Sequence, residues 1–121
     1  MEANVKLLII LNRNPYDGTD VTWNALRLAD FTLQAGDSVR LFLMNDAVDL
    51  AREGIAPGAY DKDLGEMLRA LIGKGVAVKV CGTCLTRCGV GKEKPLIAGA
   101  EKGKMPELVA WLKEADKVVS F

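Results

Sequence analysis

The class of fold follows from an almost unbroken apolar run near the amino terminus, VKLLIIL at Val5–Leu11. A strand with one face in water would alternate apolar and polar residues, but only Lys6 interrupts this run. We therefore expect a strand that is covered on both faces. Two further runs have the same character, Ser38–Met44 and Val76–Cys81. Strands of this kind are typical of a parallel sheet at the centre of an α/β protein.

Amphipathic patterns with helix signals separate these runs. Thr19 or Asp20 can cap a first helix, which Gly36 stops. Asp61 can cap a second helix, which glycines following residue 72 end. Pro106 suits the first turn of a third helix. The alternation of buried strands with helices indicates βα units.

Shorter segments complete the pattern. Ala47–Arg52 predicts a short helix, and Leu96–Ala100 predicts a short strand or a helical turn. Asp116–Phe121 predicts a last strand. The whole pattern predicts a three-layer α/β/α sandwich with a mostly parallel sheet of about five strands. At 121 residues we expect one domain, residues 1–121.

Charge and hydropathy exclude several classes of function. Sixteen basic and sixteen acidic residues give a net charge of zero, which argues against binding to nucleic acid. No apolar run approaches the roughly 20 residues that span a bilayer, and no secretory signal is evident. We therefore expect a cytoplasmic protein that binds neither membrane nor nucleic acid.

The chain has no histidine and three cysteines, which lie within eight residues of each other as C-x-x-C-x-x-x-C: Cys81, Cys84 and Cys88. The absence of histidine excludes Ser/His/Asp triads and Cys/His dyads. A tetrahedral zinc site or an iron–sulfur cluster needs a fourth ligand, which neither histidine nor cysteine can supply here. The sequence therefore predicts cysteine chemistry without a metal or a cofactor.

Cys81 ends the third expected strand, at the edge of the sheet where α/β proteins bind ligands. Gly82 would allow a tight exit from the strand, and Thr83 would cap a helical turn. Backbone N–H groups, the helix dipole and the nearby Arg87 would favour the thiolate. A positioned thiolate can take up sulfane sulfur without a general base.

Other interpretations of these residues stay open. Cys81 can be a small apolar residue that ends a buried strand. Cys81 and Cys84, three residues apart at a helix start, can form a redox-active disulfide. Asp46 and Asp49 follow the second expected strand and could form a catalytic pair of carboxylates, but Asp after a strand is more often a cap or a solvated turn residue, and we interpret them in that way.

Several segments follow one another in an order found in a known family. They are the opening strand, the Pro15 loop before Asn24–Ala29, then Gly36–Met44, Asn45–Val48, Cys88–Val90 and Ala115–Phe121. In this order the chain resembles the DsrE/DsrF-like sulfur-relay family, with its YchN-like and TusD-like members. The resemblance implies a three-layer α/β fold, assembly into trimers or hexamers, and a persulfide-carrying cysteine after the third long strand.

Counting back eight residues from Gly89 places Cys81 at the position of that cysteine. Cys84 matches a second cysteine of some members, and Cys88 stands where others often carry arginine. The resemblance thus implies a sulfur carrier or sulfurtransferase-like protein, with sulfur donor and acceptor proteins as partners. Cys81 would hold the persulfide and Cys84 would resolve or shield it, while Gly82, Thr83 and Arg87 would support the anion.

Two alternatives remain beside this expectation. One is a non-catalytic oligomeric module whose subunit clefts bind a small ligand or a partner protein. The other is a thiol–disulfide redox protein that uses the C-x-x-C pair. Exposure to a sulfane-sulfur donor would distinguish them, because only the carrier gains sulfur on one particular cysteine.

Overall fold

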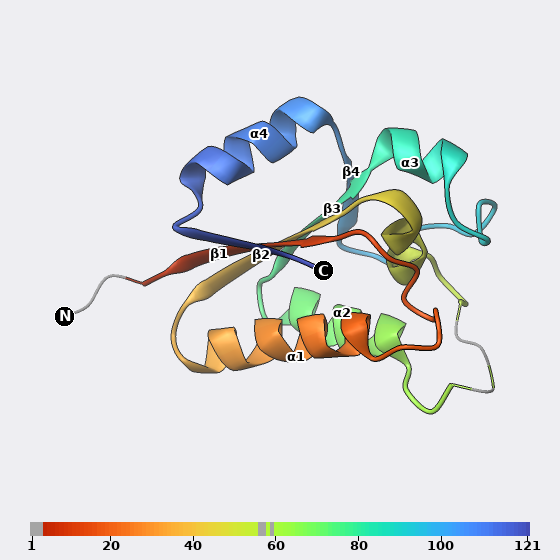
Figure 1. Cartoon of the computed structure of the whole chain (residues 1–121), viewed down its shortest axis with the longest axis horizontal. Helices are drawn as coiled ribbons and strands as arrows, with labels where there is room; N and C mark the ends of the chain where they lie inside the picture. The colour runs from red at the N-terminus through yellow and green to blue at the C-terminus, as the bar shows by residue number, and fades with distance from the viewer. Residues whose placement is uncertain (1–3, 56–57, 59) are drawn as a thin grey trace.

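The structure is a computed structural model and describes residues 4–55, 58 and 60–121. Strands and helices alternate along the chain (Figure 1). They are β1 (Lys6–Leu11), α1 (Val21–Gln34), β2 (Ser38–Leu43), the 3-10 helix η1 (Asn45–Ala51), α2 (Leu64–Gly73), β3 (Ala77–Cys81), α3 (Gly82–Arg87), β4 (Ala100–Gly103), α4 (Met105–Glu114) and β5 (Lys117–Ser120). In the described part of the chain, no helix combines the length and the apolar character that a membrane span requires.

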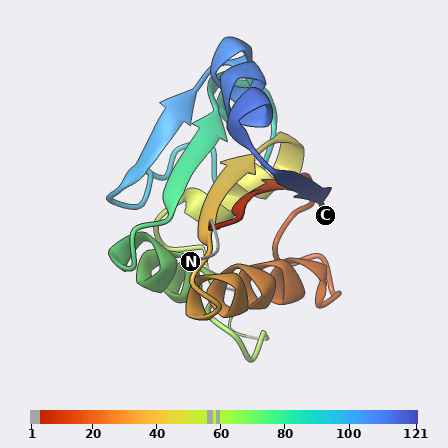
Figure 2. The same ribbon diagram turned by 90° about the vertical axis from the view of Figure 1, so that its left-hand side faces the viewer.

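The five strands form one sheet in the order β4-β3-β2-β1-β5, and every pair is parallel. Figure 2 shows β4 at one edge and β5 at the other. From β1 to β4 the chain moves steadily toward one edge, and it then returns across the sheet to place β5 beside β1. Because parallel crossovers are right-handed, this reversal of direction moves the last helix to the opposite face. The α/β fold with about five strands is confirmed.

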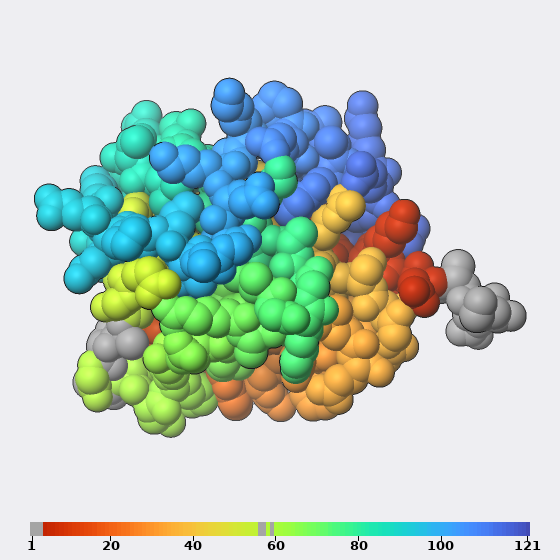
Figure 3. All heavy atoms as spheres, turned by 180° about the vertical axis from the view of Figure 1, so that it is seen from behind, coloured from red at the N-terminus to blue at the C-terminus, as the bar shows by residue number. Residues whose placement is uncertain are grey.

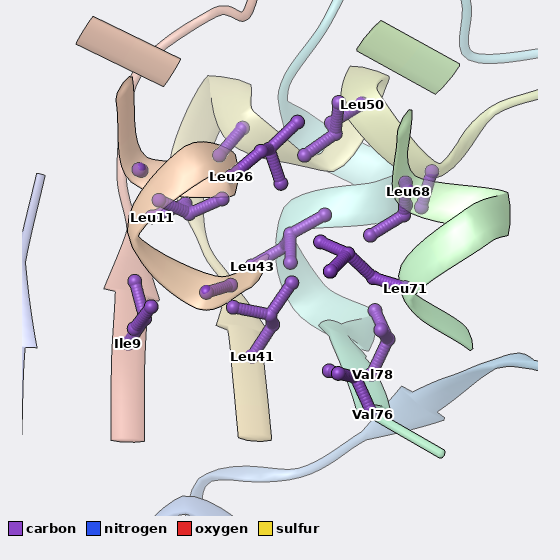
Figure 4. Close-up of a cluster of buried hydrophobic side chains, with 14 of the residues drawn as sticks. Ile9, Leu11, Leu26, Leu41, Leu43, Leu50, Leu68, Leu71, Val76 and Val78 are labelled. Atoms are coloured by element: carbon purple, nitrogen blue, oxygen red, sulfur yellow. The ribbon is translucent and has the colours of Figure 1, made fainter. Parts of the chain in front are cut away.

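Helices α1, α2 and η1 cover one face of the sheet, and α4 covers the other (Figure 1). The larger core lies under α1 and α2, where leucine, isoleucine and valine side chains from strands and helices meet (Figure 4). They include Ile9, Leu11, Leu26, Leu41, Leu43, Leu50, Leu68, Leu71, Val76 and Val78. Strands β1 and β2 thus carry buried residues on both faces, as their apolar runs predicted. Strand β3 is buried on one face through Val78 and Val80, but on its other face only Cys81 is buried.

The smaller core lies under α4 and is built around an aromatic pair. Trp111 packs edge to face on Phe42, with ring centroids 6.1 Å apart. Leu8, Leu108 and Cys81 complete the cluster. Cys81 therefore has its side chain on the α4 face, at the end of a strand whose Val78 and Val80 belong to the larger core.

Two helix starts agree with the sequence and one differs. Asp20 occupies the N-cap position of α1, although its side chain makes no capping hydrogen bond, and Pro106 lies in the first turn of α4, as expected. The N-cap of α2 is Asp63 and not Asp61, because the helix begins at Leu64. The Asp63 carboxylate accepts the Glu66 N–H at 3.0 Å, which satisfies one of the free donors of the first turn.

The fourth strand also differs from the expectation. Strand β4 is AEKG at Ala100–Gly103, so the expected strand or helical turn at Leu96–Ala100 overlaps it by one residue only. Leu96 instead makes an isolated antiparallel bridge with Arg52. Strand β4 lies at an edge and two of its four residues, Glu101 and Lys102, are charged and exposed, so no apolar run marks it.

Candidate functional site

Cys81 is both the last residue of β3 and the N-cap of α3. Its Sγ accepts the backbone N–H of Cys84 at 3.4 Å. Because α3 begins immediately after the strand, Thr83 lies within the helix and is not its cap, contrary to the sequence prediction. The side chain of Cys81 is mostly buried, with 8% of its surface exposed.

A pocket of about 670 Å³ opens over this junction. It lies beyond the carboxyl ends of β2, β3 and β4, where α3 and α4 begin. Its lining residues are Met44, Cys81, Gly82, Thr83, Cys84, Thr86, Gly103, Lys104 and Met105. Lys104 is the one charged side chain among them. The structure therefore brings four of the predicted site residues, Cys81 to Cys84, to one pocket at the predicted edge of the sheet.

Cys84 is half-buried and lies between α3 and the residue that follows β2 and Met44. Its Sγ accepts the backbone N–H of Asn45 at 3.1 Å. Burial, and next a hydrogen bond with the Cys81 side chain, raise the pKa of the Cys84 thiol to about 11. Asn45 has φ 52°, the one positive value for a non-glycine residue in the part of the chain described, and its Nδ2 donates to Asn12 Oδ1 at 3.1 Å. Because its pKa is about 11, the Cys84 thiol is protonated at neutral pH.

The other predicted site residues lie less centrally. Cys88 follows α3, its N–H donates to the Cys84 carbonyl at 2.7 Å, and it does not line the pocket. Arg87 is exposed in the last turn of α3 and also lies outside the pocket lining. A Cβ on Gly82 would meet Gly103 O at 3.6 Å, an ordinary contact, so the exit from β3 does not require glycine. Within residues 4–55, 58 and 60–121, no group of three or more metal-ligating side chains is arranged around a common point.

A buried ion pair behind the cysteines is a feature that the sequence analysis missed. Asp49 and Arg52, both on or next to η1, are 1% and 4% exposed. Arg52 Nε lies 3.2 Å from Asp49 Oδ1, although its N–H is not aligned as a hydrogen bond. The Arg52 guanidinium donates to Leu85 O at 2.8 Å and to Lys92 O at 3.1 Å. The pair therefore ties η1 to α3 and to the loop after it.

Asp46 and Asp49, both on η1, hold the turn that follows α3. The N–H of Gly89 donates to Asp46 Oδ1 at 3.2 Å, and those of Val90 and Gly91 donate to the Asp49 carboxylate at 2.8 and 3.3 Å. Seen from behind, the loop after α3, in light blue, lies against the segment after η1, in yellow-green (Figure 3). The interpretation of Asp49 as a solvated turn residue is therefore wrong. Gly89 and Gly91 flank a single residue, and this spacing of glycines in the sequence predicts a tight turn.

Comparisons with known proteins agree with this geometry. A family model described as the DsrE/DsrF-like family matches residues 5–121. Protein YchN of Escherichia coli (strain K12) is 40% identical over 119 residues, which cover 96% of this chain and 98% of YchN. The uncharacterized protein MJ0989 of Methanocaldococcus jannaschii is 38% identical over 117 residues, covering 97% of this chain and all of that protein.

Solved structures show the same arrangement of elements. The crystal structure of the ychN protein from E. coli superposes with a TM-score of 0.83 at 40% identity and covers 97% of this chain and 99% of that one. The structure of MTH1491, a protein of unknown function from Methanobacterium thermoautotrophicum, gives a TM-score of 0.71 at 16% identity over 98% of this chain and all of that one. This second likeness supports the fold alone. With the family match over nearly the whole chain, these findings show that the chain belongs to the DsrE/DsrF-like family.

Proposed function

We propose that the protein is a sulfur carrier of the sulfurtransferase type, which holds sulfane sulfur as a persulfide on Cys81. One observation carries the proposal: Cys81 ends β3 at a pocket of about 670 Å³, with its Sγ accepting the Cys84 N–H at 3.4 Å. A hydrogen bond from an amide favours the anionic form of sulfur, which is the reactive form. Membership of the DsrE/DsrF-like family is compatible with sulfur relay.

The transfer that we propose needs no oxidant and no cofactor. The Cys81 thiolate attacks the outer sulfur of a donor persulfide, R–S–SH. A new S–S bond forms at Cys81 while the S–S bond of the donor breaks, and the donor leaves as R–S⁻ with the bonding electron pair. The proton stays on the outer sulfur or passes to the leaving thiolate. The same exchange in the opposite direction delivers the sulfur to an acceptor thiolate.

The pocket suits a reactive sulfur of this kind. Met44 and Met105 contribute apolar side chains to its lining. Lys104 supplies one positive charge in the lining, and the hydroxyl of Thr83 is a further donor there. We give Arg87 no direct part, because its side chain is outside the lining.

Intact-mass measurement after exposure to a low-molecular-weight persulfide tests the proposal. We expect the wild-type protein to gain the mass of one sulfur atom per chain, and Cys81→Ser to gain none. Cys88→Ser is the matched control, because it removes a nearby thiol outside the pocket and should load like the wild type. Peptide mapping should place the added sulfur on Cys81.

Two other outcomes would overturn the proposal. Equal loading of the wild type, Cys81→Ser and Cys88→Ser would show that no cysteine is privileged, and a non-catalytic binding module would then be the better interpretation. Conversion of the wild type to a Cys81–Cys84 disulfide, without retained sulfur, would favour a thiol–disulfide redox protein.

A further inference from the structure

The pocket that Cys81 lines contains the positive charge of Lys104. The other lining residues are glycines, threonines, methionines and the two cysteines. As far as residues 4–55, 58 and 60–121 define the pocket, no carboxylate belongs to its lining. A sulfur donor that enters the pocket therefore meets one ammonium group and no acidic side chain.

Strand pairing brings Lys104 close to Cys81, although the two are distant in the sequence. Cys81 ends β3 and is the register partner of Gly103, which ends β4. Gly103 is buried, and a Cβ built on it would lie 3.1 Å from Lys79 Cβ and 3.2 Å from Phe42 Cε2. The end of β4 is thus packed closely against the sheet, and Lys104 is the first residue after it. The strand ends fix the position of Lys104 next to the strand end that carries Cys81.

The backbone of Lys104 is also held by the start of α4. Lys104 is the N-cap of this helix, and its N–H donates to Glu107 Oε1 at 3.0 Å. Its carbonyl accepts the N–H of Glu107 at 2.9 Å and that of Leu108 at 3.3 Å. The residue itself is exposed, so its side chain can reach a molecule in the pocket while its peptide groups stay fixed.

The other charges near Cys81 are paired or lie outside the pocket lining. Lys79, two residues before Cys81 on the same face of β3, is paired with Glu107 of α4. Glu101, the register partner of Lys79 on β4, is exposed and does not line the pocket. Among the described residues, no carboxylate forms an ion pair with the Lys104 ammonium. Glu107 thus neutralises Lys79, and Lys104 is the cation left to act on a molecule in the pocket.

We propose that Lys104 determines the specificity of the pocket, and that it favours persulfides R–S–SH whose R group carries a negative charge close to the sulfur. The inference rests on the proposed function of Cys81 as the sulfur-bearing residue. A thiolate and an anionic donor repel each other, and a neighbouring ammonium offsets this repulsion. The charge on R takes no part in the exchange itself, in which the same S–S bonds form and break. A pocket of about 670 Å³ has the size of sites that bind small molecules, which favours a low-molecular-weight donor.

Persulfides that share one two-carbon skeleton test the proposal. They derive from 2-sulfanylethanesulfonate, 2-sulfanylethanol and cysteamine, so that R is anionic, neutral or cationic. For each variant the loading rate of Cys81 is divided by that variant's rate with the neutral donor, and comparison of these ratios with those of the wild type cancels the reactivity of the donors. We expect Lys104→Gln to lower the ratio for the anionic donor by about three- to tenfold and to raise that for the cationic donor. Lys104→Arg should keep the wild-type ratios.

Lys102→Gln is the matched control. Lys102 is an exposed lysine of β4 outside the pocket lining, and its register partner Val80 belongs to the core on the other face of the sheet. Its replacement removes the same charge from the protein as Lys104→Gln does. We expect the wild-type ratios in this variant, because the charge is lost from outside the pocket.

Alkylation of Cys81 gives a second readout that needs no sulfur donor. Iodoacetate and iodoacetamide have nearly the same size, but only iodoacetate carries a negative charge. The rate with iodoacetate divided by the rate with iodoacetamide, followed at Cys81 by peptide mass, should fall by about three- to tenfold in Lys104→Gln. It should fall further in Lys104→Glu and stay unchanged in Lys102→Gln.

The two measurements separate this inference from the proposed function. If no persulfide loads Cys81 but the alkylation ratio falls in Lys104→Gln, the proposed function is wrong and the selection of anions by Lys104 stands. Persulfide loading with wild-type ratios in Lys104→Gln, or an unchanged alkylation ratio in that variant, would overturn the role of Lys104. An equal change in Lys102→Gln would overturn it as well, because the effect would then belong to the net charge of the protein.

Discussion

A glycine and a buried carboxylate determine the backbone behind the cysteines. Gly89 has φ +88°, and a Cβ built on it would lie 2.4 Å from Asp49 Oδ1. The Asp49 carboxylate accepts the backbone N–H groups of Val90 and Gly91 and lies beside Arg52. It therefore cannot move away from Gly89 without breaking these contacts. The loop after α3 therefore depends on a residue without a side chain at position 89.

We predict that Gly89→Ala lowers the free energy of unfolding by roughly 2–4 kcal/mol, through backbone strain and the clash with Asp49. Gly73→Ala is the control, because Gly73 ends α2 with nothing within 4 Å of its added Cβ. That variant should be neutral or up to about 1 kcal/mol more stable. Urea denaturation of both variants measures the difference, and equal stabilities would contradict the role of the close contact.

At the scale of elements, α4 is attached to the sheet by charges at two points along its length. Glu107 pairs with Lys79 of β3, and Glu114 pairs with Arg40 of β2. Both cations also lie over the Trp111 ring, 5.6 and 5.1 Å from its centroid. The hydrogen bonds to Lys79 and Arg40 lower the pKa of Glu107 and of Glu114 below the ordinary value of 4.5. These contacts favour the folded state only while both carboxyl groups are ionised.

We predict an acid-dependent loss of stability that originates in these pairs. A carboxyl group whose pKa is lower in the folded state stabilises it above the unfolded pKa, and that contribution disappears as the pH falls through the folded pKa. The melting temperature should thus fall from about pH 5 downward. The double variant Glu107→Gln with Glu114→Gln should show a shallower fall over the same range, because it lacks both titrating groups. Its amide oxygen at position 107 can still accept the Lys104 N–H, as the carboxylate does. An equal fall of the melting temperature with pH in the wild type and the double variant would refute this.

For the whole molecule, an apolar surface extends over α4 and β5. Met105, Val109 and Leu112 recur at helical spacing along one side of α4 and are exposed, and so is Val118 of β5. Val118 pairs with Leu8 and hence lies on the face of the sheet that α4 covers. An exposed patch of this kind marks surfaces where proteins associate.

We predict that the protein is at least a trimer and that this surface takes part in the assembly. Light scattering at micromolar concentration measures the mass. Leu112→Asp should lower the mass, because it puts a charge into the apolar contact. Phe31→Asp is the control: Phe31 is exposed on α1, on the opposite side of the sheet, and its replacement should leave the mass unchanged. A monomeric wild-type protein, or dissociation by Phe31→Asp alone, would show the prediction to be wrong.

The amino-acid sequence by itself determined the centre of the fold and the place of the cysteines. Strands β1 and β2 are almost continuous apolar runs because both of their faces carry buried residues, β3 is a shorter run with one face in the larger core, and these patterns are local. Cys81 is the last residue of the third run, so its position at the carboxyl edge of the sheet was predictable from the order of residues alone.

The tertiary structure alone decided what surrounds the cysteines. Strand β4 is recognised by its pairing with β3 and not by its polar residues, since edge strands gain their place through backbone hydrogen bonds. Asp49 is buried because its partners come from residues about forty positions later in the chain. The surroundings of Cys84 likewise depend on Asn45, whose N–H donates to the Cys84 sulfur from the end of another strand. Burial and electrostatic contacts between distant segments arise only when the chain folds, and they have no local pattern in the sequence.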